Sequence, residues 1–175
     1  PFTHNAMGSR IFKNIKGKVN VDEYIWENPS SSIEGVEHLR EIIKDYDAMI
    51  AVGSGTVSDS IKYATFLEKK TYSVFATTPM NAYTTGTASI SFNGVKKSLV
   101  AHYAQGVFFD LEVLSNCPKR LTAAAFADVI CRTTAQVDWL MSHKLLETNY
   151  QSTPYSLLSL YEGDMIQSAS SIAEG

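Results

Sequence analysis

The residues best suited to binding a phosphate group form a small-residue turn, Gly53-Ser54-Gly55-Thr56. This turn follows an uninterrupted apolar run over residues 48–52 and precedes a segment with helical spacing. Where a strand passes through such a turn into a helix, free backbone N–H groups and the positive end of the helix dipole meet at one point. Phosphate binds readily there. The turn lacks the third glycine of the Rossmann fingerprint and the Lys-Ser/Thr of the P-loop, so glycine placed for packing alone is the alternative.

Further polar groups lie close to this turn in the sequence. Ser58 and Asp59 belong to the segment with helical spacing, and a hydroxyl-rich loop without charged residues follows the next expected strand, residues 71–75. The threonines of this loop are Thr77, Thr78, Thr84 and Thr85. Their hydroxyl groups are suited either to a cofactor or substrate, or to the local backbone.

Asp128 lies in an apolar stretch, residues 123–130. A carboxylate in such a stretch is costly unless it is paired or bound to a metal. Arg132, four positions further on, would pair with it on one helix face. A metal ion is the alternative partner. Asp138 and His143 lie on the same expected helix, Leu121 to Leu146, but their spacing from Asp128 is not that of a metal pair on one face.

Periodicity predicts an α/β part first. Apolar spacing from Ile33 onward favours a surface helix capped by one of the serines at 30–32, and residues 48–52 are typical of a parallel strand covered on both faces. Asn93-Gly94 between residues 87–92 and 95–100 predicts a hairpin with a type I′ turn. Residues 107–110 resemble one more buried strand, whereas residues 1–8 show no periodicity and are expected to form a loop. Residues 17–25 are a weak strand candidate.

Beyond Pro118 the pattern is helical, with expected helices at residues 121–146 and 157–172. We therefore predict an α/β, Rossmann-like parallel sheet domain at residues 1–117, followed by the start of an all-helical domain at residues 118–175.

Composition excludes several function classes. The 175 residues are 45% hydrophobic with a net charge of -3, so the whole chain offers no basic surface to nucleic acid or anionic membranes. No apolar run approaches the roughly 20 residues of a membrane span, and no leader pattern opens the chain. We expect a soluble, cytoplasmic protein with reduced thiols at Cys117 and Cys131. It contains no nucleophile elbow, His-Glu-x-x-His or Cys-x-x-Cys, the minimum parts of hydrolase and zinc-protease sites.

Residues 52–64, Val-Gly-Ser-Gly-Thr-Val-Ser-Asp-Ser-Ile-Lys-Tyr-Ala, resemble the glycine-rich motif of the iron-containing alcohol dehydrogenase superfamily, in the branch of sn-glycerol-1-phosphate dehydrogenase. Three further stretches agree in order: Ala76-Thr77-Thr78-Pro79 with Tyr83-Thr84, Phe109-Asp110-Leu111 with Leu114 and Pro118, and Ala125-Phe126-Ala127-Asp128 with Thr134-Ala135 and Asp138-Trp139. Together they cover most of the chain.

The resemblance implies a dehydroquinate synthase-like NAD(P) domain and a helical metal-binding domain, with substrate and metal between them. Residues of the turn would contact the cofactor diphosphate or hold its turn: Gly53, Ser54, Gly55, Thr56 and Asp59. Residues of the following loop would line the nicotinamide side: Thr77, Thr78 and Tyr83. Asp128 would be the first ligand of a divalent metal, Zn, Fe or Ni, that polarises the substrate alcohol, while NAD or NADP carries the redox chemistry.

Three features depart from the family pattern. Asn81 stands where the family usually carries an aspartate, which removes a substrate-binding or proton-relay carboxylate. Arg132 replaces an expected lysine and keeps the charge with a different geometry. Family members are longer, with a first strand before Pro1 and two histidine ligands beyond Gly175, so we expect a fragment incomplete at both ends. Asp128 alone does not complete a catalytic metal site, which takes about three protein ligands.

Three functions stay open on these grounds. The first is a metal- and NAD(P)-dependent dehydrogenase acting on a polyol or polyol phosphate. The second is a cyclase or lyase of the 3-dehydroquinate synthase type, with only a transient hydride transfer. The third is a catalytically inactive nucleotide-binding module. The partner expected for the enzyme is a small molecule, and a homo-oligomer is left open.

Overall fold

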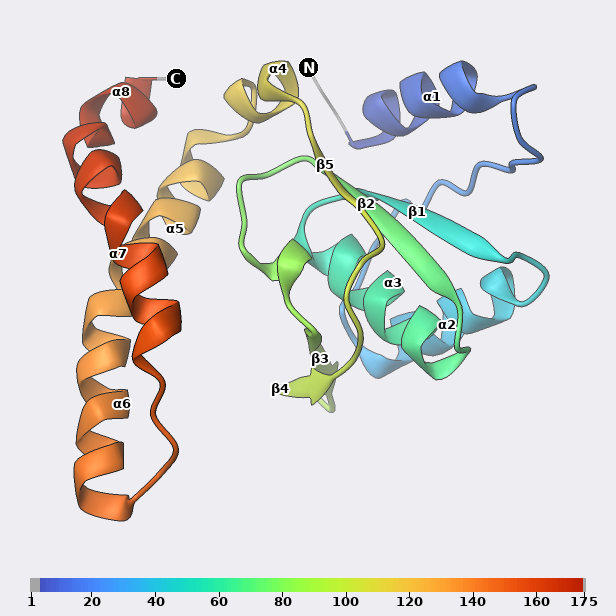
Figure 1. The fold of residues 1–175 in the computed structure, drawn as a ribbon. Coiled ribbons are helices and arrows are strands. Elements are labelled where there is room, and N and C mark those ends of the chain that lie inside the picture. The colour runs from blue at the N-terminus through green and yellow to red at the C-terminus, as the bar shows by residue number, and fades with distance from the viewer. Residues whose placement is uncertain (1–3, 175) are drawn as a thin grey trace. The chain divides into compact units, whose positions relative to one another are not determined.

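The computed structural model describes residues 4–174. Its elements, drawn in Figure 1, follow in the order α1 (His4–Ile15), α2 (Ile33–Ile43), β1 (Ala48–Gly53), α3 (Gly55–Leu67), β2 (Thr71–Ala76), the 3-10 turn η1 (Ala82–Thr84), β3 (Thr87–Phe92), β4 (Val95–Val100), β5 (Val107–Phe109), α4 (Leu111–Ser115), α5 (Lys119–Ile130), α6 (Arg132–Leu146), α7 (Ser152–Gln167) and α8 (Ala169–Glu174). The chain divides into two compact units after Cys117.

A parallel sheet in the order β1-β2-β5 is the centre of the first unit. Ala48 to Gly53 of β1 pair in register with Thr71 to Ala76 of β2, and Val74 of β2 pairs with Val107. Both β1 and β2 therefore end at the same edge of the sheet, where ligands of open α/β sheets bind. The parallel α/β class is confirmed. The expectation that residues 48–52 and 107–110 are buried strands is only partly met, because Ile50 of β1 is 51% exposed and Phe108 of β5 is 56% exposed.

Helices α2 and α3 lie beside each other, with α3 against β1 and β2 (Figure 1). Ser32 caps α2 as expected, its side chain accepting a hydrogen bond from the N–H of Gly35 at 3.2 Å. The core contains the inward positions of these helices and strands, namely Val36, Leu39, Ile43, Ala51, Ile61, Ala64, Tyr72, Val74, Ala76, Tyr83, Ala88 and Ile90. Burial of this apolar surface holds the sheet and the two helices in one body.

Strands β3 and β4 form the expected antiparallel hairpin. Thr87 pairs with Val100 and Phe92 pairs with Val95. The turn residues Asn93 and Gly94 have φ of 49° and 79°, the positive pair that defines a type I′ turn. The prediction is confirmed, because Asn-Gly tolerates this backbone at two successive positions.

Two expectations for the first 25 residues are wrong. His4 to Ile15 form α1, whose apolar positions Met7, Ile11 and Ile15 recur every four residues and lie mostly beyond the stretch expected to be a loop; residues 1–3 lie outside the described part. Residues 17–25 form no strand in the described structure. Residues 19–25 line, together with α1 and β1, a cavity of about 870 Å³. A strand without a partner would leave its backbone groups unpaired.

The second unit consists of α5 to α8. The expected single helix over residues 121–146 is wrong: α5 ends at Ile130 and α6 begins at Arg132. At this junction Cys131 Sγ donates to the carbonyl of Asp128, and the Thr133 and Thr134 hydroxyls donate to the carbonyls of residues 130 and 131. Side chains that bond to helix carbonyls in this way bend helices. None of the described helices is both long and apolar enough to cross a membrane.

Candidate functional site

The turn between β1 and α3 has the geometry of an anion site. Ser54 adopts an extended backbone at the N-cap of α3, and its carbonyl accepts from the N–H of Ser58 at 3.0 Å, while its side chain makes no cap hydrogen bond. The first N–H groups of α3 lack intrahelical acceptors and point outward with the positive end of the dipole. A Cβ at Gly53 would lie 3.0 Å from the Val57 side chain, so glycine allows the close strand-to-helix approach.

Hydrogen bonds of Tyr83 connect this turn to the loop that follows β2. The Tyr83 side chain is fully buried, its hydroxyl donates to the carbonyl of Gly53 at 3.2 Å, and it shares a 2.7 Å hydrogen bond with the hydroxyl of Thr78. The N–H of Thr77 donates to the same Gly53 carbonyl at 3.3 Å. Burial raises the pKa of the Tyr83 phenol. The hydroxyls of Thr78 and Tyr83 thus support the turn, and contact of Thr77, Thr78 or Tyr83 with a nicotinamide stays a prediction.

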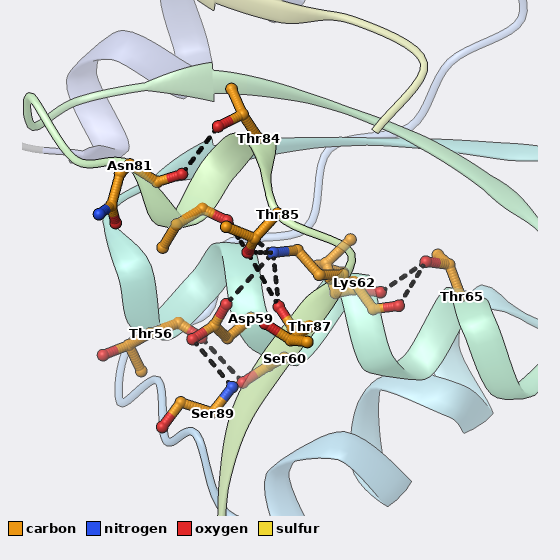
Figure 2. Close-up of polar contacts among 12 residues, drawn as sticks. Thr56, Asp59, Ser60, Lys62, Thr65, Asn81, Thr84, Thr85, Thr87 and Ser89 are labelled. Atoms are coloured by element: carbon orange, nitrogen blue, oxygen red, sulfur yellow. Dashed lines mark hydrogen bonds and ion pairs between the residues drawn. The ribbon is translucent and has the colours of Figure 1, made fainter. Parts of the chain in front are cut away.

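Asp59 connects α3 with the β3 strand (Figure 2). Its Oδ2 accepts from the N–H of Ser89 at 3.2 Å, and its Oδ1 lies 3.6 Å from Nζ of Lys62. Burial raises the pKa of the Asp59 carboxyl, and the Lys62 charge opposes the rise. Of the two roles predicted for Asp59, these contacts favour holding the structure around the turn over touching a diphosphate.

Lys62 is the residue of this region that the sequence argument missed. It is fully buried, and its ammonium donates to the carbonyls of Ala82 at 2.6 Å and Thr87 at 2.9 Å. Figure 2 draws Lys62 with its contact to Thr87. Burial lowers its pKa, and Asp59 opposes this. The available signal was its position three residues after Asp59 on a helix and next to the inward Ile61, which places both charges on or near the packed side.

Asn81 lies at the start of η1 with its side chain exposed. Its carbonyl accepts from the N–H of Thr84 at 3.1 Å and from the Thr84 hydroxyl at 2.9 Å. The loop that carries Asn81 also carries Thr77 and Thr78, so the residues expected on the nicotinamide side belong to one segment at the edge of the sheet where β1 and β2 end.

Asp128 is exposed on α5 of the second unit. Arg132 forms an ion pair with Glu162 of α7. Asp138 and His143 belong to α6, so they do not share the helix of Asp128 as expected. Among residues 4–174, no group of three or more His, Cys, Asp or Glu side chains is arranged to hold a metal ion. Metal binding through Asp128 therefore stays a prediction.

The glycine turn, the loop after β2 and the hairpin all fall within a match to the family model for iron-containing alcohol dehydrogenase, which covers residues 2–118. The chain belongs to the iron-containing alcohol dehydrogenase family.

Relatives within this family place the chain in the glycerol-1-phosphate dehydrogenase-like branch. Glycerol-1-phosphate dehydrogenase (NAD(P)+) of Pyrococcus furiosus is 31% identical over 169 residues, which are 95% of this chain and 48% of that protein. The protein of the same name from Geobacillus thermodenitrificans is 34% identical over 120 residues, 68% of this chain and 30% of that protein. The iron-containing alcohol dehydrogenase chain thus spans about half the length, or less, of these curated relatives.

Solved structures of a glycerol dehydrogenase and of an alcohol dehydrogenase share the fold. Glycerol dehydrogenase from Schizosaccharomyces pombe matches with a TM-score of 0.64 and 21% identity, over 73% of this chain and 34% of that chain. An archaeal Red Sea brine pool alcohol dehydrogenase matches with a TM-score of 0.65 and 16% identity, over 73% of this chain and 41% of that chain. The expected fold class is confirmed by these likenesses.

Proposed function

We propose that the protein containing this chain is an NAD(P)-dependent, metal-containing dehydrogenase that interconverts a polyol phosphate of the glycerol 1-phosphate type and its ketone. The observation that carries the proposal is the N-terminus of α3, presented by a glycine turn at the edge where β1 and β2 end. The family and its glycerol-1-phosphate dehydrogenase relatives support the substrate class.

The N–H groups at the start of α3 would bind the cofactor diphosphate, since helix N-termini stabilise anions. Gly53 keeps the strand and helix close enough to present them, and Tyr83 holds the Gly53 carbonyl away from the anion by bonding to it. The loop around Asn81 would border the nicotinamide and substrate. When bound, the nicotinamide supplies hydride chemistry and a divalent metal supplies Lewis-acid polarisation of the substrate oxygen.

Asn81 bears on substrate choice. An amide can donate and accept hydrogen bonds but carries no charge and does not take up a proton near neutral pH. In this proposal Asn81 therefore orients a substrate hydroxyl or phosphate oxygen by hydrogen bonding, and proton transfer occurs at another group or at water. The Asn81 side chain is exposed on the loop after β2, so no burial cost attaches to this polar group.

The first test places a negative charge at the turn. Ser54→Asp in the complete protein should keep the fold, because aspartate is as good an N-cap as serine and suits the helix dipole. The carboxylate should repel a diphosphate and raise the Kd for NAD(P)H by at least about tenfold, since like charges near a protein surface repel by several kcal/mol. Unchanged cofactor affinity would refute the assigned diphosphate site.

Ser32→Asp is the matched control. Ser32 caps α2 with the same residue type and an extended backbone, and α2 belongs to no part of the proposed site. This variant should leave the Kd for NAD(P)H unchanged within about twofold, because its charge stands at a different helix N-terminus.

The second test removes the metal. Dialysis against a chelator should abolish oxidation of glycerol 1-phosphate, followed by nicotinamide absorbance, and Zn²⁺, Fe²⁺ or Ni²⁺ added separately should restore it to different extents. Substrate conversion without any net change in nicotinamide absorbance would instead identify a lyase or cyclase, and a protein that binds cofactor but turns over no alcohol would be a nucleotide-binding module.

A further inference from the structure

Lys62 satisfies its ammonium completely inside the protein. Its side chain is fully buried, and the three N–H donors face three oxygen atoms: the Ala82 carbonyl at 2.6 Å, the Thr87 carbonyl at 2.9 Å and the Thr85 hydroxyl at 3.3 Å. An ammonium has three donors and no acceptor. A buried ammonium is tolerated only when paired in this way, so the position of all three oxygens is tied to the position of Lys62.

Two of the three oxygens belong to the second half of the loop after β2, at Ala82 and Thr85, and the third belongs to Thr87, the first residue of β3. They lie 20 to 25 residues from Lys62 in the sequence. Asp59, one turn earlier on α3, accepts a hydrogen bond from the N–H of Ser89 in β3, and its carboxylate lies 3.6 Å from the Lys62 ammonium. Figure 2 shows these contacts converging between α3, η1 and β3. Helix α3 therefore holds η1 and the residues that follow it through Lys62, while Tyr83 of η1 bonds back to Thr78 and to the Gly53 carbonyl.

Lys70 provides an internal comparison. It too donates to three backbone carbonyls, those of Ile43 at 2.7 Å, Lys44 at 2.5 Å and Tyr46 at 2.6 Å, and it thereby satisfies the C-terminal end of α2. None of these acceptors belongs to the loop after β2. The two lysines therefore donate to backbone carbonyls in the same way but in different segments. Replacing either lysine should lower stability, whereas only replacement of Lys62 should affect the loop after β2.

We propose that Lys62 is a positioning residue, which sets the loop of residues 77–86 relative to the N-terminus of α3 and so sets the spacing between the nicotinamide and diphosphate parts of the site. The proposal rests on the function proposed above. Lys62 touches neither cofactor nor substrate in this scheme. Without it the α3 N-terminus keeps its own geometry, but the loop with Asn81 moves, and misplacement of a reacting group by about 1 Å costs on the order of a hundredfold in rate.

The test uses the complete holoenzyme with Lys62→Met, which keeps most of the length of the side chain and removes its charge and donors. We expect kcat/KM for glycerol 1-phosphate to fall by about tenfold to a hundredfold. The Kd for ADP-ribose, which carries the diphosphate but no nicotinamide, should change by less than about twofold, because the α3 N-terminus is intact. Lys70→Met is the control: it should lower the unfolding midpoint while leaving kcat/KM and the ADP-ribose Kd of the folded enzyme unchanged.

Amide hydrogen exchange supplies a readout that needs no activity. Lys62→Met should speed exchange in residues 77–86 and spare residues 53–57, and Lys70→Met should spare both. If Lys62→Met does not fold, Thr85→Ala, which removes one acceptor from the loop side, takes its place and should produce the same pattern at smaller amplitude.

Equal loss of ADP-ribose binding and turnover, or unchanged exchange in residues 77–86, would overturn the role of Lys62. A wild-type enzyme that fails to bind ADP-ribose or to oxidise any polyol phosphate would overturn the proposed function instead, whatever the exchange of the loop shows.

Discussion

Replacing Tyr83 with phenylalanine tests how the turn between β1 and α3 is held. The variant keeps the ring in the core and removes a hydroxyl that donates to the Gly53 carbonyl at 3.2 Å and shares a bond of 2.7 Å with Thr78. The Gly53 carbonyl retains the N–H of Thr77 at 3.3 Å, but the Thr78 hydroxyl, 1% exposed, loses its Tyr83 partner. A buried hydroxyl left unpaired costs about 1–3 kcal/mol, so we expect Tyr83→Phe to lower the free energy of unfolding by about 2 kcal/mol.

A double-mutant cycle separates the hydrogen bond from the packing. Thr78→Val removes the other hydroxyl at nearly constant shape. In the double variant both hydroxyls are absent, so neither is left without the partner that the other supplied. It should therefore be more stable than the sum of the single effects predicts, by about 1 kcal/mol. Urea unfolding followed by circular dichroism measures all four proteins, with shifted midpoints and an unchanged slope.

Tyr46→Phe is the control for this cycle, because the Tyr46 hydroxyl bonds to Asp22 at an exposed site. Its effect should stay within about 0.5 kcal/mol. The Tyr83 hydroxyl contributes no buried hydrogen bond to stability if Tyr83→Phe costs no more than this exposed control, or if the effects of Tyr83→Phe and Thr78→Val simply add.

Two further predictions concern backbone conformation and pH. Gly163→Ala in the interior of α7, where a Cβ meets nothing within 4 Å, should raise the free energy of unfolding by about 0.5–1 kcal/mol. Gly94→Ala, at a φ of 79° in the hairpin turn, should lower it by about 1 kcal/mol. Shifts of the two urea midpoints in the same direction would contradict this. Burial lowers the pKa of His102 below its ordinary 6.5, with the Lys62 charge adding to the fall. The unfolded chain therefore binds the proton first, so stability should decline as the pH falls below 6.5, and His102→Gln, compared with wild type across that range, should flatten the decline.

The sequence predicted the elements around the site well where the signal was local. Apolar spacing located α2, an uninterrupted apolar run located β1, and Asn93-Gly94 specified the hairpin turn. It failed where local signals were weak or misleading. Two of the three apolar positions of helix α1, Ile11 and Ile15, lie beyond residue 8, and residues 17–25 have β-type residues without a neighbouring strand to pair with.

The site shows the same division. The glycine turn could be predicted because a strand, small residues and a helix are contiguous, so local physics alone puts free N–H groups at the start of α3. The particular contacts of Tyr83 with Gly53 and of Asp59 with Ser89 could not be predicted, since these partners lie 30 residues away in the sequence. Hydroxyl and carboxylate groups suited to a ligand are also suited to a distant backbone group, and only packing decides which they meet.

By itself, then, the sequence determined the order of strand, turn and helix that makes an anion site, and the motifs that reveal the family. The tertiary structure decided which of those polar residues face that site and which hold it. Lys62 shows the reason most directly. In the sequence it is one charged residue among others with helical spacing, and its proposed positioning role depends on folding, which brings the carbonyls of Ala82 and Thr87 to within 3 Å of its ammonium. Burial then makes that contact obligatory, since an ammonium cut off from water must find its acceptors in the protein.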